Sequence, residues 1–264
     1  MDNTANKAVG DAHPAIATPA APSHLTRGSK LLLLIGAWSG VVGALLAFVA
    51  NGLHPHPTDF RLEALLQQIA DSSTWGTIHL TLLGALVLIL GALVAITFSI
   101  DGEPGATVAR FACLAALLGG ALILVSTAMD GFAMQQLARS WLDAPLAEKA
   151  TALRVADALE TAQYAVFSLS IVLFLGLGIF LYGLAIVLGS VYPKALGWLA
   201  MLSGAGAFVV GIVQALSGPS FRGSEFFFVL FSVLSTIWVL IMGVIMGRKA
   251  QLRHANIQGV PLPH

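Results

Sequence analysis

Three histidines are the residues of this chain best suited to metal chemistry. His54 and His56 alternate with prolines in the segment His54–Pro57. Prolines favour an extended backbone, in which residues i and i+2 point the same way, so both imidazoles can face one point. His79 supplies a third imidazole. Three histidines, or two with a carboxylate, are typical ligands of zinc or another divalent ion. The sequence therefore predicts a metal site formed by His54, His56 and His79.

Two carboxylates are candidates for the same place. Asp59 follows the histidine segment, and Asp130 lies at the end of a long apolar run. A pair of Asp130 and His79 is the more specific hypothesis, because a carboxylate that holds an imidazole fixes its tautomer and raises its basicity. Simpler interpretations stay open. The segment His54–Pro57 can be a polar connection where the chain leaves the membrane, His79 can be an interfacial histidine hydrogen-bonded to a carbonyl, and Asp130 can cap or position the projecting hairpin.

Haem is a separate alternative, because histidine is also a ligand of haem iron. Membrane b-type haems use two facing histidines on different helices, and only His79 lies within an apolar run. A His–Met pair would have to use Met129 or Met134. Methionines inside apolar helices more often serve packing. The sequence argues against haem and leaves a divalent metal as the candidate cofactor.

Six long apolar runs must position these residues. Of the 264 residues, 57% are hydrophobic and 10% are charged, whereas soluble domains carry about 25% charged residues. A helix of about 20 apolar residues spans the roughly 30 Å hydrocarbon core, and unpaired backbone groups are not tolerated there. The predicted fold class is all-α, a polytopic membrane protein with a bundle of six transmembrane helices. The predicted domain is 31–247, with helices over 31–52, 73–100, 106–131, 160–188, 197–216 and 225–247.

The two ends of the chain set the expected orientation. Residues 1–30 are rich in Ala, Pro and Thr, which predicts a disordered tail. Residues 248–264 form a short basic tail that begins with Arg248 and Lys249. Because positive charges near helix ends stay in the cytoplasm, we expect both termini inside. The expected location is a bacterial inner membrane, crossed several times.

The third and fourth helices are expected to continue outside the membrane. Between 131 and 160 there is no hydrophobic span, and no Gly or Pro follows Pro145 until Gly176. Asp143-Ala144-Pro145 predicts that one helix ends there and the next one begins. The result would be a hairpin, with 145–188 about 66 Å long if unbroken. Apolar residues at i, i+3, i+4 and i+7 predict another element, a short amphipathic helix on the outer surface that contains Leu62, Leu65, Leu66 and Ile69.

Polar residues near the membrane gather on the outer side of the predicted bundle. His79, Asp130, Gln163 and Gln214 are expected to line an outward-facing pocket that binds a ligand. Carriers usually have carboxylates near the midplane, and the chain has none there, which disfavours a secondary transporter. The pattern favours a non-catalytic binder or accessory protein over an enzyme. Its partners would be the lipid bilayer and a small amphipathic ligand or a membrane protein.

Other functions and partners stay open. One alternative is a metal-dependent membrane enzyme or redox protein that uses His54, His56 and His79, and another is an assembly factor that docks a partner through the 131–160 hairpin. The zero net charge indicates no nucleic-acid partner. The single cysteine excludes an intrachain disulfide. Small-residue stripes permit close packing within the bundle or a homo-oligomer, and they are Gly36-x-x-x-Gly40 and Gly243-x-x-x-Gly247.

Three motifs connect the chain with a known type of protein: Trp75-x-x-x-His79, the segment 129–134 (Met-Asp-Gly-Phe-Ala-Met) and Pro193-x-x-x-Gly197-Trp198. With them the chain resembles six-helix bacterial membrane proteins grouped as domains of unknown function. The resemblance covers roughly residues 30–250 and implies no activity. Membrane hydrolases related to alkaline ceramidase also use His and Asp within helices, but they need further histidines on a late helix. No histidine lies between His79 and His254, which excludes that family.

Overall fold

The computed structural model describes residues 24–55, 61–218 and 224–258. Every regular element within these ranges is helical, which confirms the predicted all-α class. Six helical segments are long and apolar enough to cross a membrane. They are α1 (His24–Leu53), α3 (Trp75–Ser99), α4 (Ala106–Ala128) with η1 (Met129–Met134) and α5 (Gln135–Asp143), α6 (Lys149–Ser170) with η2 (Ile171–Gly178) and α7 (Ile179–Leu188), α8 (Lys194–Ser217) and α9 (Ser224–Gln258); α2 (Leu62–Asp71) is short.

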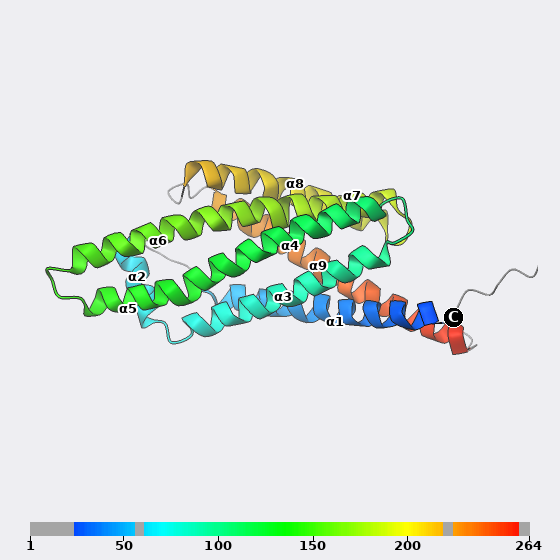
Figure 1. Ribbon diagram of the computed structural model, residues 1–264, viewed down its shortest axis with the longest axis horizontal. Helices are drawn as coiled ribbons and strands as arrows, with labels where there is room; N and C mark the ends of the chain where they lie inside the picture. The colour runs from blue at the N-terminus through cyan, green and yellow to red at the C-terminus, as the bar shows by residue number, and fades with distance from the viewer. Residues whose placement is uncertain (1–23, 56–60, 219–223, 259–264) are drawn as a thin grey trace, which may run out of the picture.

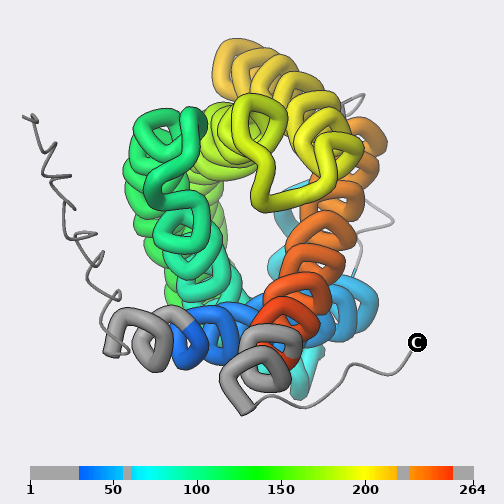
Figure 2. Tube along the Cα trace, turned by 90° about the vertical axis from the view of Figure 1, so that its right-hand side faces the viewer, coloured from blue at the N-terminus to red at the C-terminus, as the bar shows by residue number. Residues whose placement is uncertain are grey.

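The six spans form a ring in which each segment packs on its neighbours in chain order. Packing of α1 on both α3 and α9 closes the ring, as the view along the bundle shows (Figure 2). The spans run along the long axis in alternating directions (Figure 1). The start of α1 and the end of α9 therefore share one end, which we call the terminal end. The opposite end carries α2 and the tip between α5 and α6, and we call it the hairpin end (Figure 1).

Small residues let the helices of the ring approach closely. A Cβ added to Gly40 of α1 would lie 3.1 Å from Gly243 Cα of α9, so both predicted small-residue stripes contribute to packing within the bundle. Larger side chains fill the interior of the ring. Tyr182 and Trp238 are fully buried, and the Tyr182 hydroxyl donates to Leu93 O at 2.9 Å. The core is thus closed by tight backbone contacts at the rim and aromatic rings inside.

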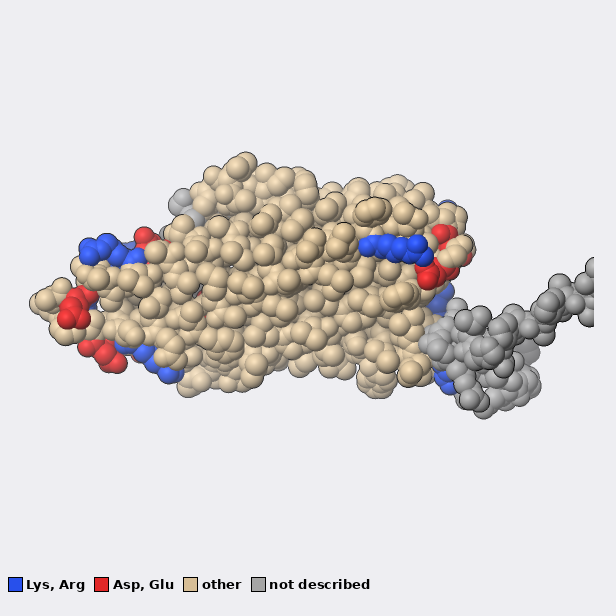
Figure 3. Space-filling model, viewed as in Figure 1, with Lys and Arg blue, Asp and Glu red and all other residues tan. Residues whose placement is uncertain are grey.

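Large apolar side chains cover the outside of the ring. Trp38, Phe98, Phe111 and Leu202 are among those that are exposed. In the space-filling view, charged side chains lie near the two ends and an uncharged band separates them (Figure 3). An apolar surface of this extent is stable only in contact with lipid. The chain is therefore a multi-pass membrane protein with six spans.

Two segments are longer than a bilayer requires. The helices over Ala106–Asp143 and Lys149–Leu188 contain 38 and 40 residues, or about 57 and 60 Å against a hydrocarbon core of roughly 30 Å. They project beyond the other spans at the hairpin end, as predicted (Figure 1). The second helix restarts at Lys149 rather than at Pro145. The reason is a turn in which Pro145 O accepts hydrogen bonds from the amides of Glu148 and Lys149.

The described helices also extend further at both ends of the chain than predicted. α1 begins at His24, so the last residues of the predicted tail 1–30 are helical. α9 continues to Gln258 and includes most of the predicted basic tail 248–264. That segment contains Lys, Arg, Gln and Leu and no proline before residue 259, so its helix propensity favours continuation of α9. The remaining parts of both tails lie outside the described residues.

The predicted amphipathic helix is present as α2, and its apolar side packs against protein. Its buried residues Leu66 and Ile69 pack against α5 and α6 of the projecting hairpin. They belong to a second apolar cluster, here called the outer cluster, with the buried residues Leu66, Ile69, Trp75, Met134, Ala138 and Ala156. The projecting hairpin has an apolar surface, and the contact buries the apolar side of α2 together with that surface. α2 thereby covers the hairpin end of α3.

Cysteine labelling tests the predicted orientation. In a Cys113→Ser background, a cysteine at exposed Ser140 on α5 should react with a membrane-impermeant maleimide in intact bacterial cells. A cysteine at exposed Lys194, where α8 begins, should react only after permeabilisation. The expectation follows from the basic residues at the terminal end. The reverse labelling pattern would show that the termini face outward.

Candidate functional site

The structure brings three of the predicted residues to one point at the hairpin end. His54 directly follows α1, His79 lies in the second turn of α3, and Asp130 belongs to η1. One ligand atom from each residue lies within 4.8 Å of the other two. The hypothesised pair is formed, with His79 Nε2 lying 3.0 Å from Asp130 Oδ2. We refer to His54, His79 and Asp130 as the triad.

Local backbone features orient the side chain of each member of the triad. The α1 helix ends just before His54 because residue 55 is a proline, which disfavours helix in the preceding residue. η1 is a π-helical stretch, whose wider turns rotate Asp130 relative to a regular helix, and such stretches are frequent at functional sites. Gly131 lets η1 approach α3, since a Cβ there would lie 2.3 Å from His79 Cβ. The triad therefore depends on a crossing that tolerates no side chain at residue 131.

Trp75 is the central supporting residue, and it is not among the predicted site residues. Its indole Nε1 donates to Asp130 O at 3.1 Å. Its ring lies 4.7 Å from the His79 ring and 5.0 Å from the His54 ring, measured between centroids. It is also part of the outer cluster. The signal in the sequence is the spacing of Trp75 and His79, four residues apart on one helical face.

The partners of His79 determine which ring nitrogen carries a hydrogen. Nδ1 lies 2.8 Å from Trp75 O, and because a carbonyl oxygen only accepts, Nδ1 must donate. In the neutral ring Nε2 then has a lone pair, yet it faces an oxygen of the Asp130 carboxylate. Two acceptors at 3.0 Å repel each other unless a proton or a metal cation lies between them. The geometry therefore suits either an imidazolium–carboxylate pair or an ion bound by both residues.

His54 has a comparable orientation. Its Nδ1 lies 3.1 Å from Pro55 O, so this nitrogen donates and Nε2 has the lone pair in the neutral ring. The His54 and His79 rings meet edge to face, with centroids 5.1 Å apart. His79 is only 1% exposed, whereas the Asp130 side chain is 28% exposed. An ion would therefore approach the triad from the side of Asp130 and half-buried His54.

The other predicted site residues lie elsewhere. Gln163 donates to Ser126 Oγ at 3.1 Å, one turn below Asp130, so it lies beneath the triad. Gln214 is buried on α8, which packs on α6, α7, η2 and α9. His56 lies outside the described residues, as does Asp59. An open hollow of about 450 Å³ lies at the tip of the α5–α6 hairpin, away from these residues.

Comparisons with known proteins add no functional assignment. The chain matches no protein-family model, no curated protein and no solved structure. Two imidazoles and one carboxylate form a ligand set used for zinc and, with open positions, for ferrous iron.

Proposed function

We propose that this chain is a membrane protein that binds a divalent transition-metal ion through His54, His79 and Asp130. The supporting observation is that one ligand atom from each of the three residues lies within 4.8 Å of the other two, with His79 Nε2 3.0 Å from Asp130 Oδ2. The hydrogen bond from Nδ1 to Trp75 O supports the same role, because metal-binding histidines usually donate their other ring N–H to an oxygen. Three protein ligands leave a coordination position open for an external ligand.

The location of the triad decides which compartment would supply the ion. We propose a bacterial inner membrane with the hairpin end outside. The terminal end carries Lys30, Arg110, Lys194, Arg248 and Lys249 against the acids Asp101 and Glu103, whereas acids outnumber basic residues among the described residues of the hairpin end. By the positive-inside rule the terminal end then faces the cytoplasm. On this proposal the ion and its external ligand come from the outer side.

Metal titration of the purified full-length chain tests the proposal. After treatment with a chelator, the wild-type protein is expected to bind one zinc ion per chain. Asp130→Asn keeps the size of the side chain and removes its charge, and His54→Ala removes one ligand at a half-buried position. Each change should lower zinc affinity by more than the roughly 10- to 100-fold that loss of a residue supporting a ligand costs. Calorimetry with elemental analysis measures the effect.

Two further variants complete this experiment. Asp71→Asn is the matched control, because Asp71 is an exposed carboxylate on α2 whose partner is Gln67 of the same helix. It should bind zinc like the wild type. His56→Ala reveals whether the second histidine of the original prediction also contributes. The proposal would be contradicted if Asp130→Asn bound each of the three ions, zinc, iron(II) and manganese(II), with the same affinity as the wild type.

A further inference from the structure

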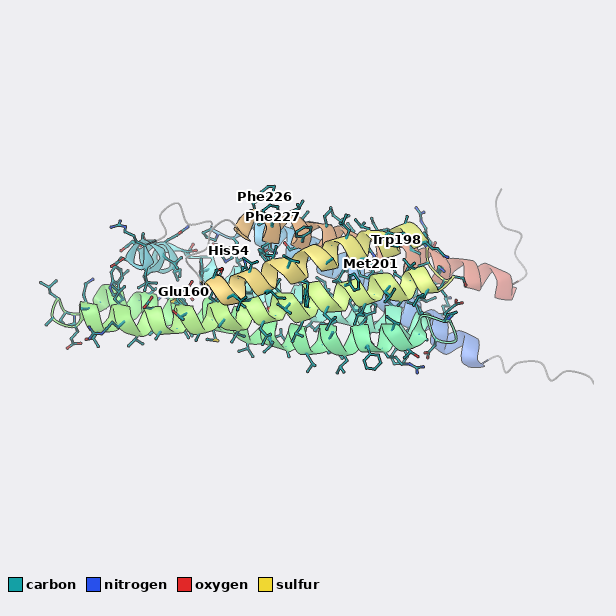
Figure 4. All side chains as sticks on the ribbon, turned by 90° about the horizontal axis from the view of Figure 1, so that it is seen from above. His54, Glu160, Trp198, Met201, Phe226 and Phe227 are labelled. Carbon is teal, nitrogen blue, oxygen red and sulfur yellow. The ribbon has the colours of Figure 1, made fainter. Side chains whose placement is uncertain are left out.

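Glu160 is a half-buried carboxylate on α6 that the triad does not include. Residues Ala156, Glu160 and Gln163 follow one another at i, i+4 and i+7, which places them on one face of the helix. Ala156 is fully buried in the outer cluster, and Gln163 bonds to Ser126 of α4. Glu160 therefore faces α4 and η1 at the height of Asp130. In Figure 4 Glu160 and His54 both lie toward the hairpin end of the bundle, with Glu160 nearer the tip.

Two further carboxylates lie near Glu160. Glu160 lies within electrostatic range of Asp130 and Asp157. Within the described ranges, no salt bridge joins Glu160 to a lysine or an arginine. Carboxylates gathered at a half-buried place repel one another unless a cation is present. The almost fully buried His79 directs its Nε2 at Asp130, the carboxylate that Glu160 faces across η1.

We propose that Glu160 is the fourth protein ligand of the ion, an inference that rests on the proposed metal site. Its carboxylate lies outside the group formed by the triad, so it would reach the ion by rotation about its flexible side-chain torsions. The complete set is then two imidazoles and two carboxylates, joining α1, α3, η1 and α6. Mixed nitrogen and oxygen sets of this kind suit manganese(II), iron(II) and zinc, whereas soft thiolate or thioether sets select copper(I). We therefore infer a hard or borderline divalent ion.

Manganese(II) titration tests this assignment, because manganese depends strongly on carboxylate ligands. Glu160→Gln keeps the shape of the side chain and should weaken manganese binding by at least about 10-fold. Asp157→Asn is the matched control, since it removes an equal charge from an exposed residue three positions away. We expect it to change the affinity by less than about 3-fold. Cobalt(II) spectra should also differ between Glu160→Gln and the wild type but not between Asp157→Asn and the wild type.

Glu160→Asp separates ligation from a general effect of charge. It preserves the negative charge on a side chain one methylene shorter, so direct ligation predicts that binding stays weak. Wild-type affinity in Glu160→Asp, or in Glu160→Gln, would overturn the assignment of Glu160. If these variants bind like the wild type while Asp130→Asn does not bind, only the fourth ligand is refuted. Absence of binding in the wild type would instead refute the metal site itself.

Discussion

A Gly131→Ala variant is expected to lose the metal site and much of the stability of the hairpin end. The added Cβ would lie 2.3 Å from His79 Cβ and 2.5 Å from His79 Cγ. His79 Cβ is bonded directly to the backbone of α3 and does not move when the side chain rotates, so η1 and α3 must separate. Overpacking of this kind costs about 1–3 kcal/mol. Separation also breaks the contact of His79 with Asp130, so zinc affinity should fall at least about 100-fold.

Gly76→Ala is the matched control for this prediction. Gly76 lies on α3 at the same crossing, but its added Cβ would meet the Gln135 side chain at 3.4 Å, an ordinary contact. Helix propensity alone favours alanine over glycine by roughly 1 kcal/mol, so Gly76→Ala should be neutral or stabilising. Thermal unfolding in detergent and zinc titration compare the two variants. Wild-type zinc affinity in Gly131→Ala would show that the close crossing is not needed for the triad.

The spans could be predicted from sequence because lipid imposes a requirement that composition alone reveals. A run such as Ile78–Ile100 leaves its backbone no partner in the bilayer except itself. The pairing of His79 and Asp130 follows from the same constraint, since few ionisable residues adjoin the apolar runs and each needs a polar neighbour. The two glutamines were grouped with them only by height in the membrane. Height does not determine which faces of two helices meet.

The supporting residues could not be predicted because they depend on helix rotation. A π-helical turn accommodates an extra residue, which shifts the faces of the following helix by about 100°. The sequence of segment 129–134 does not predict such a turn, so the approach of Gly131 to His79 is visible only in the structure. The placement of α2 depends in turn on where the rotated α5 presents its apolar side. Ala138 of α5 and the preceding Met134 of η1 lie on that side, and both belong to the outer cluster.

Trp75→Ala is expected to cause the largest loss of stability at the hairpin end. Trp75 is 2% exposed and belongs to the outer cluster while also contacting both histidine rings. Truncation of a buried tryptophan to alanine costs about 3–5 kcal/mol. It also removes the hydrogen bond to Asp130 O, and buried hydrogen bonds contribute about 0.5–1.5 kcal/mol. Protease cleavage within α2 should increase, because α2 loses a residue against which its cluster packs.

Two comparisons separate the roles of Trp75. Trp75→Phe keeps most of the apolar ring but lacks the N–H donor, so it should lose less stability than Trp75→Ala while still binding zinc more weakly than the wild type. Trp38→Ala is the control, since Trp38 is 70% exposed on the outer surface of α1 and its truncation should leave the outer cluster intact. Unfolding can be followed by reaction of a fluorogenic maleimide with Cys113, the single cysteine. If Trp75→Ala unfolded at the same temperature as Trp38→Ala, the outer cluster would not stabilise the site, and α2 would be a loosely attached cover. The expected difference arises because Trp75 of α3 contacts both His54 after α1 and Asp130 of η1, whereas truncation of Trp38 only exchanges one lipid contact for another.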